Sequence, residues 1–129
     1  MVESTRLERR LALFSIIAAI LHFVGETWFH LTFGQFLPML LVDYIAIGLL
    51  VFAGVQSLRT GEGAGLLCGA WGFTFCLNYR SLFWRVEVLL EGGGDPGLET
   101  TVLVLGGLLV VSAVAFALTL HLCSPRRSN

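Results

Sequence analysis

Long apolar runs, broken at three short places, are the main pattern along this chain. The breaks at 34–37, 59–63 and 91–97 are rich in glycine or border a proline, residues that mark turns. They leave four segments, at about 5–33, 38–58, 64–90 and 98–122. Crossing about 30 Å of hydrocarbon takes about 20 helical residues, which each segment provides. The sequence therefore predicts an all-α fold, a polytopic membrane protein whose single domain over residues 1–129 is a bundle of four transmembrane helices.

Composition agrees with a membrane protein and excludes another class. Hydrophobic residues make up 56% of the chain and charged residues 13%, whereas about a quarter of an average soluble domain is charged. The net charge of −1, with no basic patch beyond two arginine pairs, excludes nucleic acid as a partner. The three cysteines form no Cys-x-x-Cys motif, so we expect small packing residues. We expect the same of Gly61, Gly65 and Gly69, whose spacing of four lets helices approach closely.

Arginines at the ends of the segments orient the bundle. In a four-span arrangement, the residues that flank the first, second and fourth segments on one side are Arg6, Arg9, Arg10, Arg59, Arg126 and Arg127. The opposite side has only Arg85 near it and is otherwise acidic. Because cytoplasmic loops carry an excess of arginine and lysine, we expect both termini in the cytoplasm. The expected location is a membrane that the chain crosses several times, as in a bacterial inner membrane.

Three ionisable residues recur every four positions within the first segment. His22, Glu26 and His30 share one stripe of a helix, because a helix advances about 100° per residue. An ionisable side chain within a membrane span is costly and often marks a functional site. Each histidine alone can be a packing residue that hydrogen-bonds to a neighbouring helix, whereas three such groups on one stripe favour a functional pocket.

Position along each segment gives depth, at about 1.5 Å per residue. His22 falls near mid-membrane and Glu26 in the outer half, and the second and third segments bring to that half Asp43, Tyr44, Asn78, Tyr79, Arg80 and Arg85. An unpaired charge in hydrocarbon costs about 2.5–3.5 kcal/mol. We therefore expect Glu26 or Asp43 to pair with Arg80 or Arg85, in a polar pocket that Trp28 and His30 also line.

The third segment has polar side chains on two faces. One stripe, which can face the bundle, holds Trp71, Thr74, Asn78, Ser81 and Arg85, and the opposite stripe holds Arg80, Trp84 and Glu87. The second stripe must reach the headgroups or meet another chain. It therefore favours a homo-oligomer or a partner membrane subunit.

Three chemistries fit the predicted pocket. Imidazole and carboxylate groups suit a metal ion, but His22 and His30 lie about 12 Å apart along a helix, so only an adjacent pair can share one ion. We therefore expect no metal and no cofactor. Proton-coupled transport would use Glu26 and the histidines as a relay in an oligomer. Acid/base catalysis on a lipid-soluble substrate would use His22, Glu26 and Asp43 to exchange a proton.

Residues 22–29, His-Phe-Val-Gly-Glu-Thr-Trp-Phe, resemble the first-helix signature of the emopamil-binding sterol isomerase (EXPERA) family. In that family a histidine, a glutamate four residues later, and then a tryptophan and a phenylalanine line an intramembrane sterol cavity. The resemblance implies a helical bundle that shifts a ring double bond through a carbocation, with His22 and Glu26 moving the proton. Asp43 stands where the family has a second acidic residue, whereas segment 98–122 lacks the asparagine and tryptophan of the family's last helix.

The expected function is to bind a small or lipid-like molecule in an intramembrane pocket, with membrane lipid around it. Two alternatives stay open. One is an embedded isomerase-type enzyme acting on a sterol-like or isoprenoid substrate, and the other is an accessory subunit of a larger membrane complex or an oligomeric proton-coupled transporter.

Overall fold

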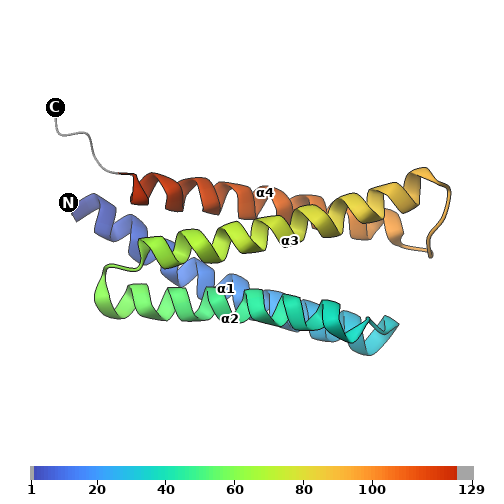
Figure 1. The fold of residues 1–129 in the computed structure, drawn as a ribbon, viewed down its shortest axis with the longest axis horizontal. Helices are drawn as coiled ribbons and strands as arrows, with labels where there is room; N and C mark the ends of the chain where they lie inside the picture. Colours follow the sequence, from blue (N-terminus) through green and yellow to red (C-terminus); the bar gives the residue numbers. More distant parts are fainter. Residues whose placement is uncertain (1, 125–129) are drawn as a thin grey trace.

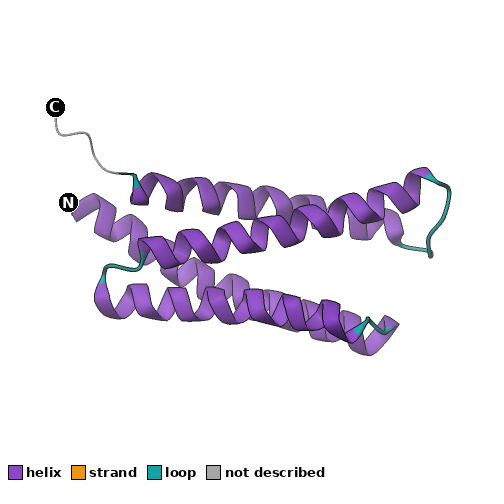
Figure 2. Cartoon of the chain, viewed as in Figure 1, coloured by secondary structure: helices purple, strands orange, loops and turns teal. Residues whose placement is uncertain are grey.

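Four helices in up-and-down order form the protein in the computed structural model, which describes residues 2–124 (Figure 1). They are α1 (Val2–Phe33), α2 (Leu37–Thr60), α3 (Ala64–Leu90) and α4 (Leu98–Cys123). Within the described residues there is no strand (Figure 2). The predicted all-α fold is thus confirmed, and each helix begins and ends within three residues of the expected position. Helices α1, α2 and α4 are long and apolar enough to cross a membrane.

The helices form two antiparallel hairpins, α1 with α2 and α3 with α4 (Figure 1). The hairpins meet at what we call the basal end, which holds the start of α1, the end of α4 and the α2–α3 connection (Figure 1). They diverge toward the opposite end, called here the open end, where the α1–α2 and α3–α4 connections lie (Figure 1). Contact between the hairpins is made mainly by α2 and α3.

Small side chains let α1 and α2 approach closely. Ala12, Ala19 and Ala53 are buried in the hydrophobic core, and Gly54 of α2 faces the backbone of α1. Without bulky side chains between them, two helix backbones can come into direct contact. The glycines predicted to do this in and before α3 do not, because Gly61, Gly65 and Gly69 have open space where a side chain would be.

Polar side chains join the helices at the basal end. Oε1 of Glu8 on α1 accepts hydrogen bonds of 2.7 Å from Oγ of Ser57 on α2 and from the backbone N–H of Gly63, the residue before α3. The first N–H groups of a helix have no partner within the helix, so a carboxylate at this position stabilises the start of α3. Helix α1 begins at Val2, three residues before the expected start of the first segment.

Helix α3 faces the bundle with the predicted stripe. Trp71, Thr74 and Asn78 are buried, while Arg80 and Trp84 are exposed. Nε1 of Trp71 donates a 2.8 Å hydrogen bond to Oγ of Ser15 on α1, and its ring stacks on that of Phe14 with centroids 5.6 Å apart. A buried indole whose N–H is paired contributes both apolar contact and a fixed register.

We predict that Gly54→Ala destabilises the protein by about 1–3 kcal/mol, the usual cost of overpacking a core. The added Cβ would lie 2.8 Å from the carbonyl oxygen of Ala12 and 2.8 Å from Cγ1 of Ile16, so α1 and α2 would have to separate. The matched control is Gly48→Ala in the same helix, where a Cβ meets nothing within 4 Å. Denaturation in detergent, followed by circular dichroism, measures both variants, and equal stabilities would contradict the close contact.

Candidate functional site

His22, Glu26 and Asp43 come together on the α1–α2 hairpin, in its half nearer the open end. Nε2 of His22 lies 3.4 Å from Oε1 of Glu26, close enough for an ion pair when the imidazole is protonated. One nitrogen or oxygen atom from each of the three residues lies within 4.8 Å of the others. The two α1 side chains are 15% and 24% exposed. Helical spacing of four and the short connection after Phe33 together produce this polar cluster.

A second set of side chains holds the cluster in place. Nε2 of Gln35, in the α1–α2 connection, donates a 3.3 Å hydrogen bond to Oδ2 of Asp43. The hydroxyls of Thr27 and Tyr44 are 2.8 Å apart and hydrogen-bonded. The ring of Phe23 packs on that of Tyr44, with centroids 5.4 Å apart. These contacts fix the rotation of α2 against α1 and so the position of Asp43.

Hydrogen bonding is incomplete beside this cluster. Among the described side chains, the buried polar atoms that lack a hydrogen-bond partner are Nδ1 of His30 and Oε1 of Gln35. His30 lies one helical turn beyond Glu26, and Gln35 is the residue that contacts Asp43. Buried polar groups are normally paired, and an exception in a folded protein needs an explanation. Both exceptions here adjoin the same cluster, which marks it as a place where something can bind.

The other residues predicted for the site lie away from the cluster. Asn78 is buried and joins α3 to α4, because its Nδ2 contacts the Leu108 carbonyl at 3.4 Å and Oγ of Ser112 at 3.3 Å. Tyr79 is exposed, and its ring packs on Phe83 of the same helix.

Trp28, Arg80 and Arg85 differ in how near they lie to the cluster. Trp28 is 61% exposed and packs edge-on against Phe33, beyond the cluster. Arg80 is exposed on the outer stripe of α3. Arg85 comes nearer, since its guanidinium carbon lies 5.8 Å from the ring centroid of Phe29 on α1.

The expected pairing of a carboxylate with an arginine does not occur. Among the side chains of residues 5–124, the ion pair that forms is His22 with Glu26. Arg80 is exposed on the stripe of α3 opposite the buried one, and the guanidinium carbon of Arg85 lies 5.8 Å from the ring centroids of Phe29 and Trp84. Arg85 is near enough to act on Asp43 through its charge, but it forms no ion pair with either carboxylate.

Sequence reasoning missed Gln35 and Thr27. Gln35 lay in a connection expected only to turn the chain, yet a connection this short keeps its side chain beside the first turns of α2. A polar residue in such a connection, eight positions before Asp43, was the available signal. Thr27 is adjacent to Glu26 in an otherwise apolar stretch, and Tyr44 is adjacent to Asp43, so their hydroxyls come together once the two acids do.

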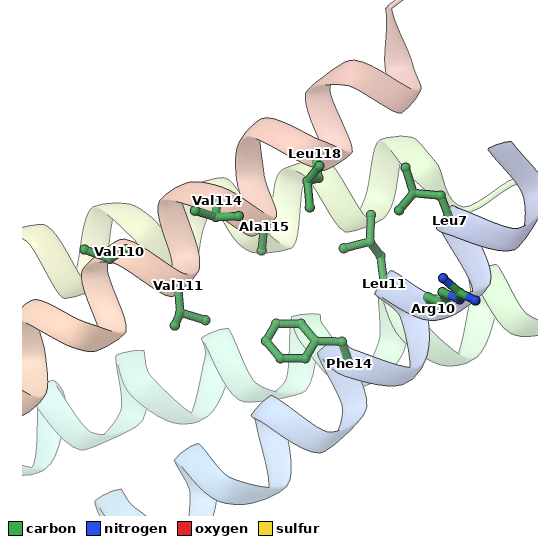
Figure 3. A pocket seen from close by; sticks show the side chains of 9 residues that line it. All are labelled: Leu7, Arg10, Leu11, Phe14, Val110, Val111, Val114, Ala115 and Leu118. Atoms are coloured by element: carbon green, nitrogen blue, oxygen red, sulfur yellow. The ribbon is translucent and has the colours of Figure 1, made fainter. Parts of the chain in front are cut away.

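A hollow lies elsewhere, between α1 and α4 toward the basal end. It has a volume of about 420 Å³ and is lined by aliphatic side chains with Phe14 and Arg10. Figure 3 shows Phe14 and Leu11 of α1 across this groove from Val111 of α4. Its only charged lining residue is Arg10, so the groove has no pair of groups for acid/base chemistry. The groove suits a hydrocarbon chain. The polar cluster begins at His22, which lies about 12 Å beyond Phe14 along α1.

No family model, curated protein or solved structure matches this chain. The function therefore has to be inferred from the polar cluster. An imidazole and two carboxylates within reach of one another can exchange a proton, bind a cation, or hold the polar end of a ligand.

We predict that Glu26 and Asp43 are energetically coupled and that Glu26 and Arg80 are not. In double-mutant cycles with Glu26→Gln, Asp43→Asn should show a coupling of about 0.5–3 kcal/mol, since the two carboxylates share one cluster, whereas Arg80→Gln should be additive within about 0.5 kcal/mol. Denaturation in detergent measures each stability. A large coupling of Glu26 to Arg80 would restore the ion pair expected from sequence.

Proposed function

We propose that the protein is an integral membrane protein with four transmembrane helices and both termini in the cytoplasm. Three helices have the length and apolar character for this. Helix α3 joins two of them through short connections and runs antiparallel to both, so it has to cross the same layer. Arg6, Arg9, Arg10 and Arg59 lie at the basal end, which is then cytoplasmic. Arg126 and Arg127, expected on the same side, lie outside the described residues.

We propose that the polar cluster binds a lipid-like molecule in the outer half of the bilayer. The carrying observation is the convergence of His22, Glu26 and Asp43, half-buried, within helices apolar enough to span a membrane. Ionisable groups inside a membrane span are costly, so they usually mark a ligand site or a reaction. The polar end of the ligand would meet the cluster. Its apolar part would lie along the open half of the hairpin, where Phe23 is 47% exposed.

A photoactivatable, alkyne-tagged long-chain alcohol tests this function. We predict that it labels α1 and α2 near the cluster, and that Asp43→Asn or Glu26→Gln weakens labelling about tenfold or more, because a hydrogen bond to a charged group is worth about 1.5–3 kcal/mol. Peptide mapping by mass spectrometry locates the label. Arg80→Gln is the matched control, since this charged residue faces away from the hairpin. Labelling that is equal in all variants would rule out a site at the cluster.

A second candidate function is acid/base catalysis on a sterol-like or isoprenoid substrate. It is favoured by the 3.4 Å contact of His22 with Glu26, because a general acid and base must lie within reach of a shared proton. Its other support is the resemblance of residues 22–29 to the sterol isomerase signature, which implies a shift of a ring double bond.

For this second candidate we predict that the protein in liposomes shifts a double bond in a sterol substrate, and that His22→Ala or Glu26→Gln lowers the rate by about 10²–10⁴-fold, the usual contribution of a positioned acid or base. Gas chromatography with mass spectrometry separates substrate from product. His121→Ala should retain the activity, because His121 is exposed in the last turn of α4 and lies outside the three-residue group. A wild-type protein without turnover leaves binding as the function.

A further inference from the structure

We propose that His22, Glu26 and Asp43 bind one divalent transition-metal ion, Zn²⁺ being the best fit. Sequence spacing alone argued against a metal, because α1 can offer no more than an adjacent pair to one ion. The third ligand comes from α2, where Asp43 meets that pair. Two α1 residues four apart and one carboxylate from the facing helix form a three-ligand site.

The spacing of the ligand atoms fits zinc. Zinc binds imidazole nitrogen and carboxylate oxygen at about 2.0–2.2 Å, so neighbouring ligands of a tetrahedral ion lie about 3.3–3.5 Å apart. Nε2 of His22 and Oε1 of Glu26 are 3.4 Å apart. Asp43 completes a group whose ligand atoms all lie within 4.8 Å of one another, so binding zinc would require Asp43 to move closer to the other two. Three protein ligands leave a fourth position open, as in catalytic rather than structural zinc sites.

The surroundings of the cluster supply what metal ligands usually have behind them. Carboxylates that bind a metal are oriented by a further hydrogen bond, and Gln35 gives one to Oδ2 of Asp43. This leaves Oδ1 of Asp43 as the oxygen that would bind the ion. Oε1 of the same Gln35 is buried without a partner, an independent sign that a polar occupant belongs beside the cluster.

Charge is the third argument. Two carboxylates share a half-buried cluster, and among the side chains of residues 5–124 no arginine forms an ion pair with either. Like charges this close repel strongly in a medium of low dielectric constant. A divalent cation would neutralise both at once. The set of one nitrogen and two oxygens, without sulfur, suits zinc, manganese or iron and disfavours copper(I).

The test is zinc binding to the full chain, purified in detergent with an affinity tag that contains no histidine and stripped with a chelator. We expect elemental analysis to find one Zn²⁺ per chain, and competition with a fluorescent zinc indicator to give affinities at least about tenfold weaker for His22→Ala, Glu26→Gln and Asp43→Asn. His121→Ala is the matched control, because this histidine is exposed in the last turn of α4 and lies outside the group. The triple cysteine variant, Cys68→Ser with Cys76→Ser and Cys123→Ser, should keep the zinc affinity of the wild type.

Thermal denaturation guards against variants that fail to fold. Zinc should raise the melting temperature of the wild-type protein and of His121→Ala, and leave that of Asp43→Asn unchanged. The proposal is overturned if the folded wild type binds no zinc, if the triple cysteine variant loses it, or if His121→Ala weakens binding as much as His22→Ala. The metal and the lipid-like ligand are tested independently. If the chelator-treated protein is still labelled by the lipid probe but has no zinc affinity, the metal proposal alone is wrong. If the protein binds zinc but is not labelled, the ligand proposal alone is wrong.

Discussion

A polar group enclosed among apolar helices has to find its partner inside the protein, and this constraint organises the whole bundle. From the basal end to the middle of the bundle, hydrogen bonds between the helices meet it. Glu8 joins α1 to α2 and to the start of α3, Ser15 joins α1 to α3 through Trp71, and Asn78 joins α3 to α4. Each of these contacts fixes how one helix is rotated and shifted along its neighbour. Apolar packing alone would allow several such arrangements. The small residues around Ala12 and Gly54 allow the helices to come close enough for these contacts.

The same constraint is unmet only around one cluster of the described residues, and the contrast gives the site its meaning. Oε1 of Gln35 and Nδ1 of His30 lack partners, while Glu26 and Asp43 share one imidazole between two acids. Since the other buried polar side chains of the described residues are paired, stability gives no reason to leave these two atoms unsatisfied. Departures from local consistency concentrate at functional sites. Ligand binding, proton transfer and metal binding differ in what completes the cluster, and all three place it at the same residues.

Helical period and connection length decided how much could be predicted from sequence. The four helices follow from apolar runs and turn residues, and the buried stripe of α3 follows from its spacing. His22, Glu26 and Asp43 were predictable as a set because both signals are local, the first two through a spacing of four and the third through a short connection. Arg80 was misplaced because its depth was given more weight than its helical phase, which puts it on the stripe opposite Trp71 and Asn78. How near Arg85 comes to the acids depends on how the two hairpins are placed, and no periodicity in the sequence encodes that.

The site is therefore a property of one hairpin, and the rest of the bundle has a different task. Residues 22–44 contain the whole polar cluster with its supporting contacts, so α3 and α4 are not needed to supply its chemistry. An isolated two-helix unit would leave both faces of the cluster open to its surroundings. The second hairpin contacts α1 and α2 mainly through α2 and α3 and diverges from them toward the open end (Figure 1). In the proposed membrane orientation, a lipid-like ligand would approach this hairpin from the side, with its polar end toward Glu26 and Asp43.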